Sequence, residues 1–161
     1  MTRRPAKKKE RALPRVKCQY DDTHATRLCT SAEIYGGRQY GGWFWKCDIC
    51  DAWVGCHGTS KKPLGTLAKA PLRMLRKQLH GIFDPLWRDN SPLRMDRTHA
   101  YAWLGTSMGV PVNKCHIAMF DEEQCRTAMK IVSEFRGMKA PPLIDNPPFI
   151  PSYINDFLNL K

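Results

Sequence analysis

Two cysteines separated by two residues, Cys47 and Cys50, directly follow an aromatic run at positions 43–45. A turn of this spacing points two thiolates at one place, and a tetrahedral zinc ion needs two such pairs of ligands. The second pair must come from elsewhere in the chain, and Cys18 is the natural third ligand. We therefore expect one structural zinc ion and a small β module that depends on it for folding.

The fourth ligand has three candidates. Three residues after Cys18, where a second cysteine of the same spacing would lie, the chain has Asp21. Cys29 is the candidate that we favour, because a hairpin turning at the glycine-rich residues 35–42 would bring it back beside Cys47. Thiolate is also the softer ligand and suits a closed zinc site better than a carboxylate. Asp21 comes next and His24 third.

The cysteine pattern also bears on the cellular compartment. Seven cysteines, an odd number with metal-type spacing, favour a reducing environment over a disulfide scaffold. A thioredoxin-like function of Cys47 and Cys50 would require a βαβ pattern, which this region lacks. No apolar run approaches the roughly 18 residues that span a bilayer. We expect an intracellular protein without a membrane partner.

The pattern of residues predicts an α+β chain, with a small zinc-ribbon β module followed by a compact region of about three helices. We place a basic tail at 1–16, the ribbon at 17–57, the helical domain at 58–137 and a proline-rich segment at 138–161. The tail is highly charged and lacks residues that form a core, so we expect it to be disordered when free. The proline-rich segment is expected to pack back across the helices.

Three amphipathic helices are predicted in the helical domain. The first begins near Pro71 and ends at Gly81 and Asp84-Pro85, with Leu72, Leu75, Leu79 and Ile82 on its buried face. The second spans about 95–108, with Gly109 as its stop. In the third, Asp121 is the N-cap and Gln124 its capping-box partner, and an apolar stripe from Cys125 to Phe135 follows.

The net charge of +11 is unevenly distributed. Residues 1–17 have eight Lys or Arg against one Glu, and residues 57–100 have nine against three acidic side chains, whereas residues 18–56 are slightly acidic. Contacts from Lys and Arg to phosphates supply most non-specific affinity for nucleic acid. The candidate basic contacts are Arg3, Arg4, Lys7, Lys8 and Lys9 in the tail, and Arg73, Arg76 and Lys77, which we place on the solvent face of the first helix.

The ribbon itself offers aromatic rings. Strand alternation places Trp43 and Trp45 on one face and Phe44 on the other. Rings exposed on a strand can stack unpaired bases. Alternatively, these rings form the small core of the metal module. Trp43 and Trp45 are therefore candidate stacking residues.

No arrangement in the sequence indicates catalysis. The dipeptides Cys56-His57 and Cys115-His116 suggest a second metal site or a thiol catalyst, but adjacent residues on a strand point to opposite faces. Buried cysteines beside hydrogen-bonded histidines are the interpretation that we favour. Asp84, Asp89 and Asp96 are too sparse for a nuclease that uses magnesium. We expect no enzyme activity and identify no small-molecule substrate.

A set of motifs resembles the "zinc-finger-containing domain" family of phage and prophage proteins over roughly residues 17–135. The motifs are Cys18-x-Tyr20, residues 32–36, Trp45-x-Cys47-x-x-Cys50, residues 54–57, residues 63–68, His80-x-x-Phe83-Asp84-Pro85-Leu86-Trp87 and Ala100-Tyr101-x-Trp103-Leu104. The resemblance implies a zinc ribbon joined to a short helical region in a phage-encoded protein. The sequence departs from the family pattern at Asp21, where the family has a second cysteine. The ribbon is also similar in type to the four-cysteine ribbons of bacterial topoisomerases, which bind single-stranded DNA.

Together these features predict a non-enzymatic, phage-type zinc-ribbon protein that binds nucleic acid, with DNA preferred over RNA. The alternative is a phage protein that binds a host protein of transcription or DNA metabolism through its aromatic ribbon and C-terminal segment. Phosphate binding weakens steeply as salt rises and an apolar protein interface weakens much less, so a salt titration separates the two hypotheses.

Overall fold

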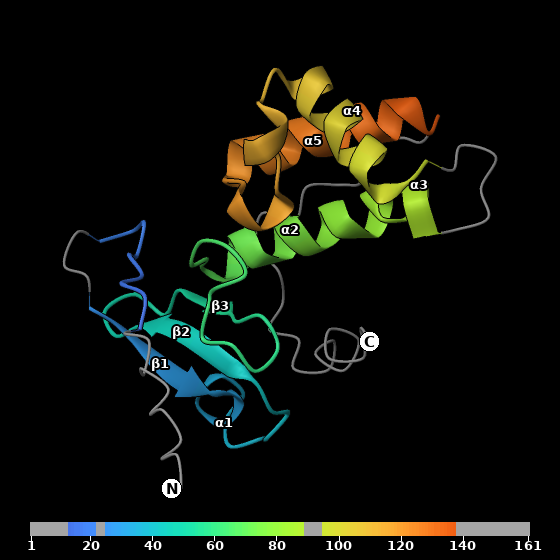
Figure 1. Ribbon diagram of the computed structural model, residues 1–161. Helices are drawn as coiled ribbons and strands as arrows, with labels where there is room; N and C mark the ends of the chain where they lie inside the picture. Colours follow the sequence, from blue (N-terminus) through green and yellow to red (C-terminus); the bar gives the residue numbers. More distant parts are fainter. Residues whose placement is uncertain (1–12, 22–24, 89–94, 138–161) are drawn as a thin grey trace, which may run out of the picture.

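The computed structural model describes residues 13–21, 25–88 and 95–137. A small antiparallel sheet occupies one part of the molecule and a group of helices the other, with α2 (Ala70–Phe83) between the sheet and the remaining helices (Figure 1). The predicted α+β class is confirmed. Arg3, Arg4, Lys7, Lys8, Lys9, His24, Asp89 and the segment 138–161 lie outside the described residues.

The sheet has three strands in the order β1 (Thr26–Thr30), β2 (Trp43–Cys47) and β3 (Trp53–Gly55), and both pairs are antiparallel. The predicted hairpin between β1 and β2 is present, and a single helical turn, α1 (Ser31–Ile34), lies in its connection. Gly36, Gly37, Gly41 and Gly42 all have positive φ there. Residues with a Cβ seldom adopt that backbone, so the glycines allow the connection to turn back.

The two faces of the sheet have different cores, as the alternation predicts. Trp45, Cys47 and Val54 pack on one face, together with Cys18 and Leu67. On the other face the rings of Tyr35, Phe44 and Trp53 meet edge to face, with centroids 5.5–5.9 Å apart. Most of the aromatic content of the ribbon therefore serves its own packing.

The helical region contains more elements than the sequence predicts. After α2 the described chain forms α3 (Pro85–Arg88), α4 (Arg97–Met108), the 3-10 turns η1 (Val112–Lys114) and η2 (Ile117–Met119), and α5 (Glu122–Phe135). Figure 1 shows α4 and α5 stacked on the side of α2 away from the sheet. A continuous core runs through them, from Leu72 in α2 to Val132 in α5.

The predicted helix signals are mostly confirmed. The Asp121 carboxylate accepts from the Gln124 backbone N–H, and the Gln124 side chain accepts from the Asp121 N–H, so the capping box is present. Gly109 ends α4 with φ 66°. The predicted stop of α2 at Asp84-Pro85 is confirmed, since the helix ends at the completely buried Phe83 with Asp84 as its C-cap, and Gly81 lies inside the last turn.

The junction between sheet and helices is tight. Trp53 in β3 and Ala68 exchange two backbone hydrogen bonds of 3.1 Å, which extend the sheet toward α2. At Gly65 an added Cβ would lie 2.1 Å from the carbonyl oxygen of Ala118, so only glycine fits. The Thr66 N–H donates to that same carbonyl at 3.1 Å. The position of the ribbon relative to η2 is thus set by backbone contacts.

Within the described residues, no helix has the length and apolar character needed to cross a membrane.

Candidate metal centre

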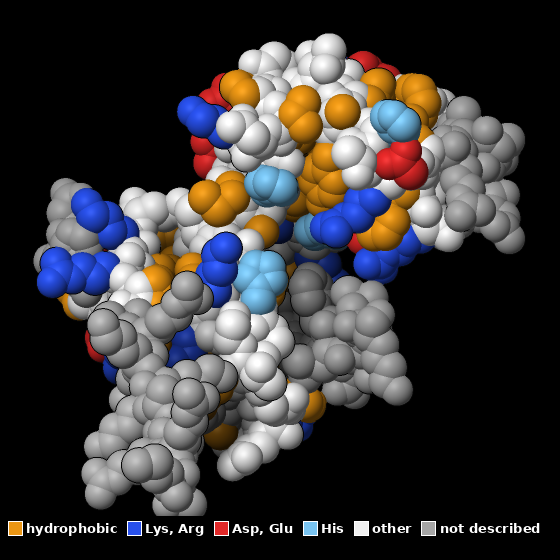
Figure 2. Space-filling view, in the orientation of Figure 1, with side chains coloured by type: hydrophobic (Ala, Val, Ile, Leu, Met, Phe, Trp, Pro, Cys, Tyr) orange, Lys and Arg blue, Asp and Glu red, His pale blue; other side chains and the backbone are white. Residues whose placement is uncertain are grey.

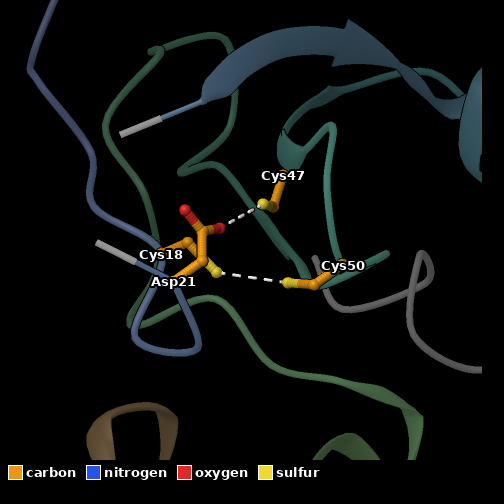
Figure 3. A group of neighbouring side chains, drawn as sticks. All are labelled: Cys18, Asp21, Cys47 and Cys50. Carbon is orange, nitrogen blue, oxygen red and sulfur yellow. Dashed lines mark hydrogen bonds between the residues drawn. The ribbon is translucent and has the colours of Figure 1, made fainter. Parts of the chain in front are cut away.

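Four side chains from two separate segments meet at one end of the sheet. Cys18 and Asp21 come from the segment before β1, and Cys47 and Cys50 come from the end of β2 and the turn after it (Figure 3). Their candidate ligand atoms all lie within 4.8 Å of one another. The Cys18 and Cys50 sulfurs are 3.4 Å apart, and the Cys47 thiol donates to Asp21 Oδ2 at 2.9 Å. The predicted thiols Cys18, Cys47 and Cys50 are therefore brought together.

The turn at residues 47–50 is held by its own backbone. The Cys47 N–H donates to the Ala52 carbonyl at 2.8 Å, and backbone groups of Ile49 and Cys50 hydrogen-bond the Cys47 sulfur. Asp51 has φ 53°, which is unusual for a residue other than glycine. This left-handed residue reverses the chain, so that Ala52 can pair with Cys47 and β3 can begin.

The three thiols differ in acidity. Burial raises the pKa of Cys18 to about 12 and also raises the pKa of Cys47. Burial acts in the same direction on Cys50. There it is outweighed by hydrogen bonds from the Ala52 backbone and from the Cys18 and Cys47 thiols, so the pKa of Cys50 is lowered. Hydrogen bonds within the cluster therefore favour the charged form of Cys50 more than that of Cys18 or Cys47.

Cys29, our favoured fourth ligand, does not join the cluster. In the observed register Cys47 pairs with Thr26, and Cys29 pairs with Phe44. Cys29 is three residues further along β1 than the partner of Cys47, and an odd offset places it on the opposite face of the sheet. It is buried there beside the aromatic cluster. The antiparallel pairing that we invoked is real, but its register gives the fourth position to Asp21 instead.

The chemistry of this donor set fits zinc. With bonds of roughly 2.0–2.3 Å, the ligand atoms of a tetrahedral zinc ion lie about 3.3–3.8 Å apart, and the four atoms are already gathered at close to this spacing. Three thiolates favour a soft or borderline ion over magnesium or calcium. Cys18, Asp21, Cys47 and Cys50 would hold the ion, and its role there would be to tie the two segments together.

The structure places the predicted nucleic-acid contacts in different environments, some exposed and some buried. Trp43 is exposed at 37 %, whereas Trp45 is only 5 % exposed and its Nε1 donates to the Lys61 carbonyl at 2.8 Å. Trp45 is thus a core residue of the ribbon and is not placed to stack a base. Lys77 is half-buried on α2.

The predicted position of Arg76 is also wrong. It is 8 % exposed, and its guanidinium donates to the Phe120 carbonyl at 2.7 and 2.9 Å and to Thr66. The predicted solvent face was wrong for this residue, because Arg76 follows Leu72 by four positions and precedes Leu79 by three. That spacing puts it on the buried stripe, where it connects α2 to two loops.

Arg73 also has a structural contact. Its guanidinium carbon lies 4.2 Å from the centre of the Trp53 ring, and the group donates to the Ala68 carbonyl. Burial lowers the pKa of Arg73 to about 10. Of the cations predicted for the solvent face of α2, Arg73 therefore holds the ribbon against the helix, and Arg76 ties the helix to the loops at Thr66 and Phe120.

The other cysteines are separate from the cluster. Cys115 and Cys125 are completely buried in the helical core, and burial raises the pKa of each thiol, that of Cys125 to about 12. Cys56 packs against the ribbon core. Across the described segments, the group around Cys47 is the only one that brings three or more metal-binding side chains together. The predicted burial is confirmed for Cys115, whereas Cys56 is only partly buried and both His57 and His116 are exposed.

Sequence reasoning missed two lysine–aromatic pairs on the ribbon. The ammonium group of Lys61 lies 5.5 Å from the centre of the Trp43 ring, and that of Lys69 lies 4.8 Å from the centre of the Tyr20 ring. Each pair joins residues distant in sequence, so no local pattern indicates it. Asp21, however, had a local signal, since it lies at the position of a second cysteine after Cys18.

An antiparallel three-stranded sheet, with a cysteine-rich ligand cluster joining the turn after one strand to the preceding segment, defines a protein of the zinc-ribbon class. The model of a family described as a zinc-finger-containing domain matches residues 14–135. The chain belongs to that family. No curated protein and no solved structure matches it.

Proposed function

We propose that this is a phage-type, non-enzymatic protein that binds nucleic acid, DNA in preference to RNA, through a ribbon held by one structural zinc ion. The observation that carries the proposal is the exposed Trp43 ring with the Lys61 ammonium group over it. A flat aromatic ring beside a cation can bind single-stranded nucleic acid, because a base stacks on the ring and the cation pairs with a phosphate.

The zinc ion contributes to this function by placement. Trp43 is the first residue of β2 and Cys47 is the last, so the metal site and the stacking ring lie at opposite ends of one strand. Zinc bound by Cys18, Asp21, Cys47 and Cys50 would fix that strand. The metal would have no direct contact with the nucleic acid.

Charge supports the same proposal. Lys61 and Lys62 are both exposed in the loop beside Trp43, and the chain as a whole carries a net charge of +11. When a base stacks on Trp43, the Lys61 ammonium group would move from the ring to a backbone phosphate. Tyr20 with Lys69 offers a second pair of the same kind. The basic residues Arg3, Arg4, Lys7, Lys8 and Lys9 would add contacts without base preference.

The test is binding of the zinc-loaded protein to a fluorescent single-stranded oligonucleotide over a salt series. Trp43→Ala should weaken binding roughly tenfold or more, as expected for loss of one stacked base. Lys61→Gln should reduce the slope of log affinity against log salt by about one. Leu64→Ala, which alters an exposed apolar residue, is the matched control and should change neither quantity.

Deletion of residues 1–12 separates the basic tail from the ribbon. Binding that persists without the tail and still depends on Trp43 would support a site on the folded ribbon. Binding that is unchanged in Trp43→Ala and disappears with the tail would show that the ribbon is not the site.

A protein partner is the second candidate function. Leu64 and Met119 are about half exposed and adjoin the close contact between Gly65 and Ala118. Two apolar side chains at a rigid junction are a plausible starting point for a protein interface. Host-protein capture that persists at high salt and is lost in the double variant Leu64→Ser, Met119→Ser would favour this function over nucleic-acid binding.

A further inference from the structure

A second group of charged and aromatic side chains lies far from the metal centre, where α2, α3 and the start of α4 meet. His80 and Asp84 belong to the end of α2, Arg88 to α3 and Arg97 to the first turn of α4. Figure 2 shows histidine, Lys or Arg, and hydrophobic side chains adjoining one another on the helical part of the molecule. The proposed function of the ribbon uses none of these residues.

The centre of the group is the carboxylate of Asp84. His80 Nδ1 lies 3.0 Å from its Oδ1, and Arg88 Nη2 lies 3.6 Å from its Oδ2. The Asp84 side chain is 17 % exposed, against 34 % for His80 and 43 % for Arg88. The carboxylate is thus the most buried of the three, and it orients a histidine and an arginine that both reach solvent.

Two arginines are held by aromatic rings of the same group. The guanidinium carbons of Arg88 and Arg97 lie 4.7 and 5.5 Å from the centre of the Trp87 ring. Arg97 is also 5.5 Å from the centre of the Tyr101 ring. Stacking uses the flat face of a guanidinium and leaves N–H groups at its edge available to an acceptor. Both cations are therefore oriented before any ligand arrives.

Among the described residues, Asp84 pairs with Arg88 and Asp96 contacts His99, but no carboxylate forms an ion pair with Arg97. Arg88 and Arg97 supply two positive charges near one indole ring, and Asp84 supplies one negative charge. Like charges around one ring repel each other, and an anion bound at a guanidinium edge would relieve that repulsion. The nearby Asp96 carboxylate is engaged by His99 and by the N–H groups at the start of α4.

We propose that Arg88, Arg97 and His80 form a binding site for a phosphate group. Arginine edges match phosphate oxygens in geometry, and the imidazole of His80, held by Asp84, is a further polar group beside them. The inference rests on the proposed function in one respect: the phosphate would belong to the backbone of the bound nucleic acid. Inorganic phosphate has the same recognition chemistry, and the experiment separates the two sources.

The experiment is an NMR titration of full-length, zinc-loaded protein at constant ionic strength, following the arginine Nε–Hε and histidine ring signals. Inorganic phosphate is added in one arm and a short single-stranded oligonucleotide in the other. We expect both ligands to shift the signals of Arg88, Arg97 and His80 more than those of Arg126 in α5. In the oligonucleotide arm, Arg88→Gln and Arg97→Gln should each weaken binding about tenfold or more, as expected for loss of a charge-assisted hydrogen bond.

Lys130→Gln removes an exposed cation from α5 and is the matched control, which should leave both titrations unchanged. Because Arg97 also contacts the Tyr101 ring in α4, Arg97→Lys is measured together with its melting temperature. Lysine keeps the positive charge but lacks the pair of N–H donors at the edge of a guanidinium. A normal melting temperature with weakened phosphate response supports the site, and a lowered melting temperature with unchanged response contradicts it.

The outcomes for the two proposals are distinguishable. Oligonucleotide binding through Trp43 with no selective shift at Arg88 or Arg97 would overturn this inference and leave the proposed function standing. Selective shifts with inorganic phosphate but no binding of the oligonucleotide would support the phosphate site and contradict the proposed function. Equal shifts at Arg126 would show unselective ion binding and overturn the inference.

Discussion

The guanidinium carbon of Arg73 in α2 lies 4.2 Å from the centre of the Trp53 ring in β3. This cation–π contact joins the ribbon to the helices, and burial of the cation accounts for the lowered pKa of Arg73. A desolvated contact of this kind contributes about 2 kcal/mol. The sheet and the helices are therefore expected to unfold together rather than as independent units.

This contact can be measured with a double-mutant cycle of Arg73→Met and Trp53→Leu. Each single variant should destabilise the zinc-loaded protein, and the coupling energy should be about 1–2 kcal/mol. Urea unfolding followed by circular dichroism gives the free energies. Strictly additive effects of the two substitutions would show that the contact is not formed in solution.

Substitution of Arg76 should lower the stability of the protein more than substitution of an exposed cation. Arg76→Met removes hydrogen bonds to the carbonyls of Phe120 and Thr66 and leaves both without this donor, that of Phe120 buried and that of Thr66 partly buried. Because these acceptors lose their hydrogen-bond donor, we expect the free energy of unfolding to fall by about 3 kcal/mol or more. The same urea experiment checks it, with Lys130→Met as the exposed control. An effect of Arg76→Met as small as that of the control would contradict the buried position.

The choice between Asp21 and Cys29 as fourth ligand is open to a direct test. Asp21→Ala should weaken zinc affinity by more than the roughly 10–100-fold that loss of an outer hydrogen-bonding partner costs, and Asp21→Cys should strengthen it. Cys29→Ser should keep one zinc per chain. Competition with a chromophoric chelator measures all three variants. Loss of zinc from Cys29→Ser with normal binding by Asp21→Ala would reverse the assignment.

Asp51 gives a prediction about backbone strain. Its φ of 53° suits glycine, so Asp51→Gly should keep or raise stability by up to about 1 kcal/mol, despite losing a weak ion pair to Lys46. Asp51→Val should lower stability by roughly 1–2 kcal/mol, because a branched side chain fits this backbone poorly. Thermal unfolding at saturating zinc compares the two. A valine variant as stable as the glycine variant would exclude the left-handed conformation.

The sequence was informative wherever structure depends on neighbours along the chain. The spacing of Cys47 and Cys50 and the capping box at Asp121 are short-range signals, and both predictions agree with the structure. The fourth ligand depended instead on strand register. A shift of three residues, which no local pattern specifies, separates Cys29 from the partner of Cys47.

The positions of the cations were harder to predict for a related reason. Arg76 could have been recognised as buried, because its spacing from Leu72 and Leu79 places it on the apolar stripe. Arg73 could not, since its partner Trp53 lies in another element 20 positions earlier in the chain. Charge alone suggests that a side chain is exposed to solvent, and only the tertiary structure shows which charged side chains form contacts inside the protein.

The contact between Gly65 and the Ala118 carbonyl limits how this protein can be divided. A side chain at position 65 would collide with a backbone atom more than fifty positions later, and the Thr66 N–H depends on the same carbonyl. A ribbon that keeps the pairing of Trp53 with Ala68 must include positions 65 and 66, and without Ala118 the Thr66 N–H would lose its acceptor. Fusion proteins or chimaeras built from this family should therefore take the segment around Ala118 together with the ribbon, since the two form one transferable unit.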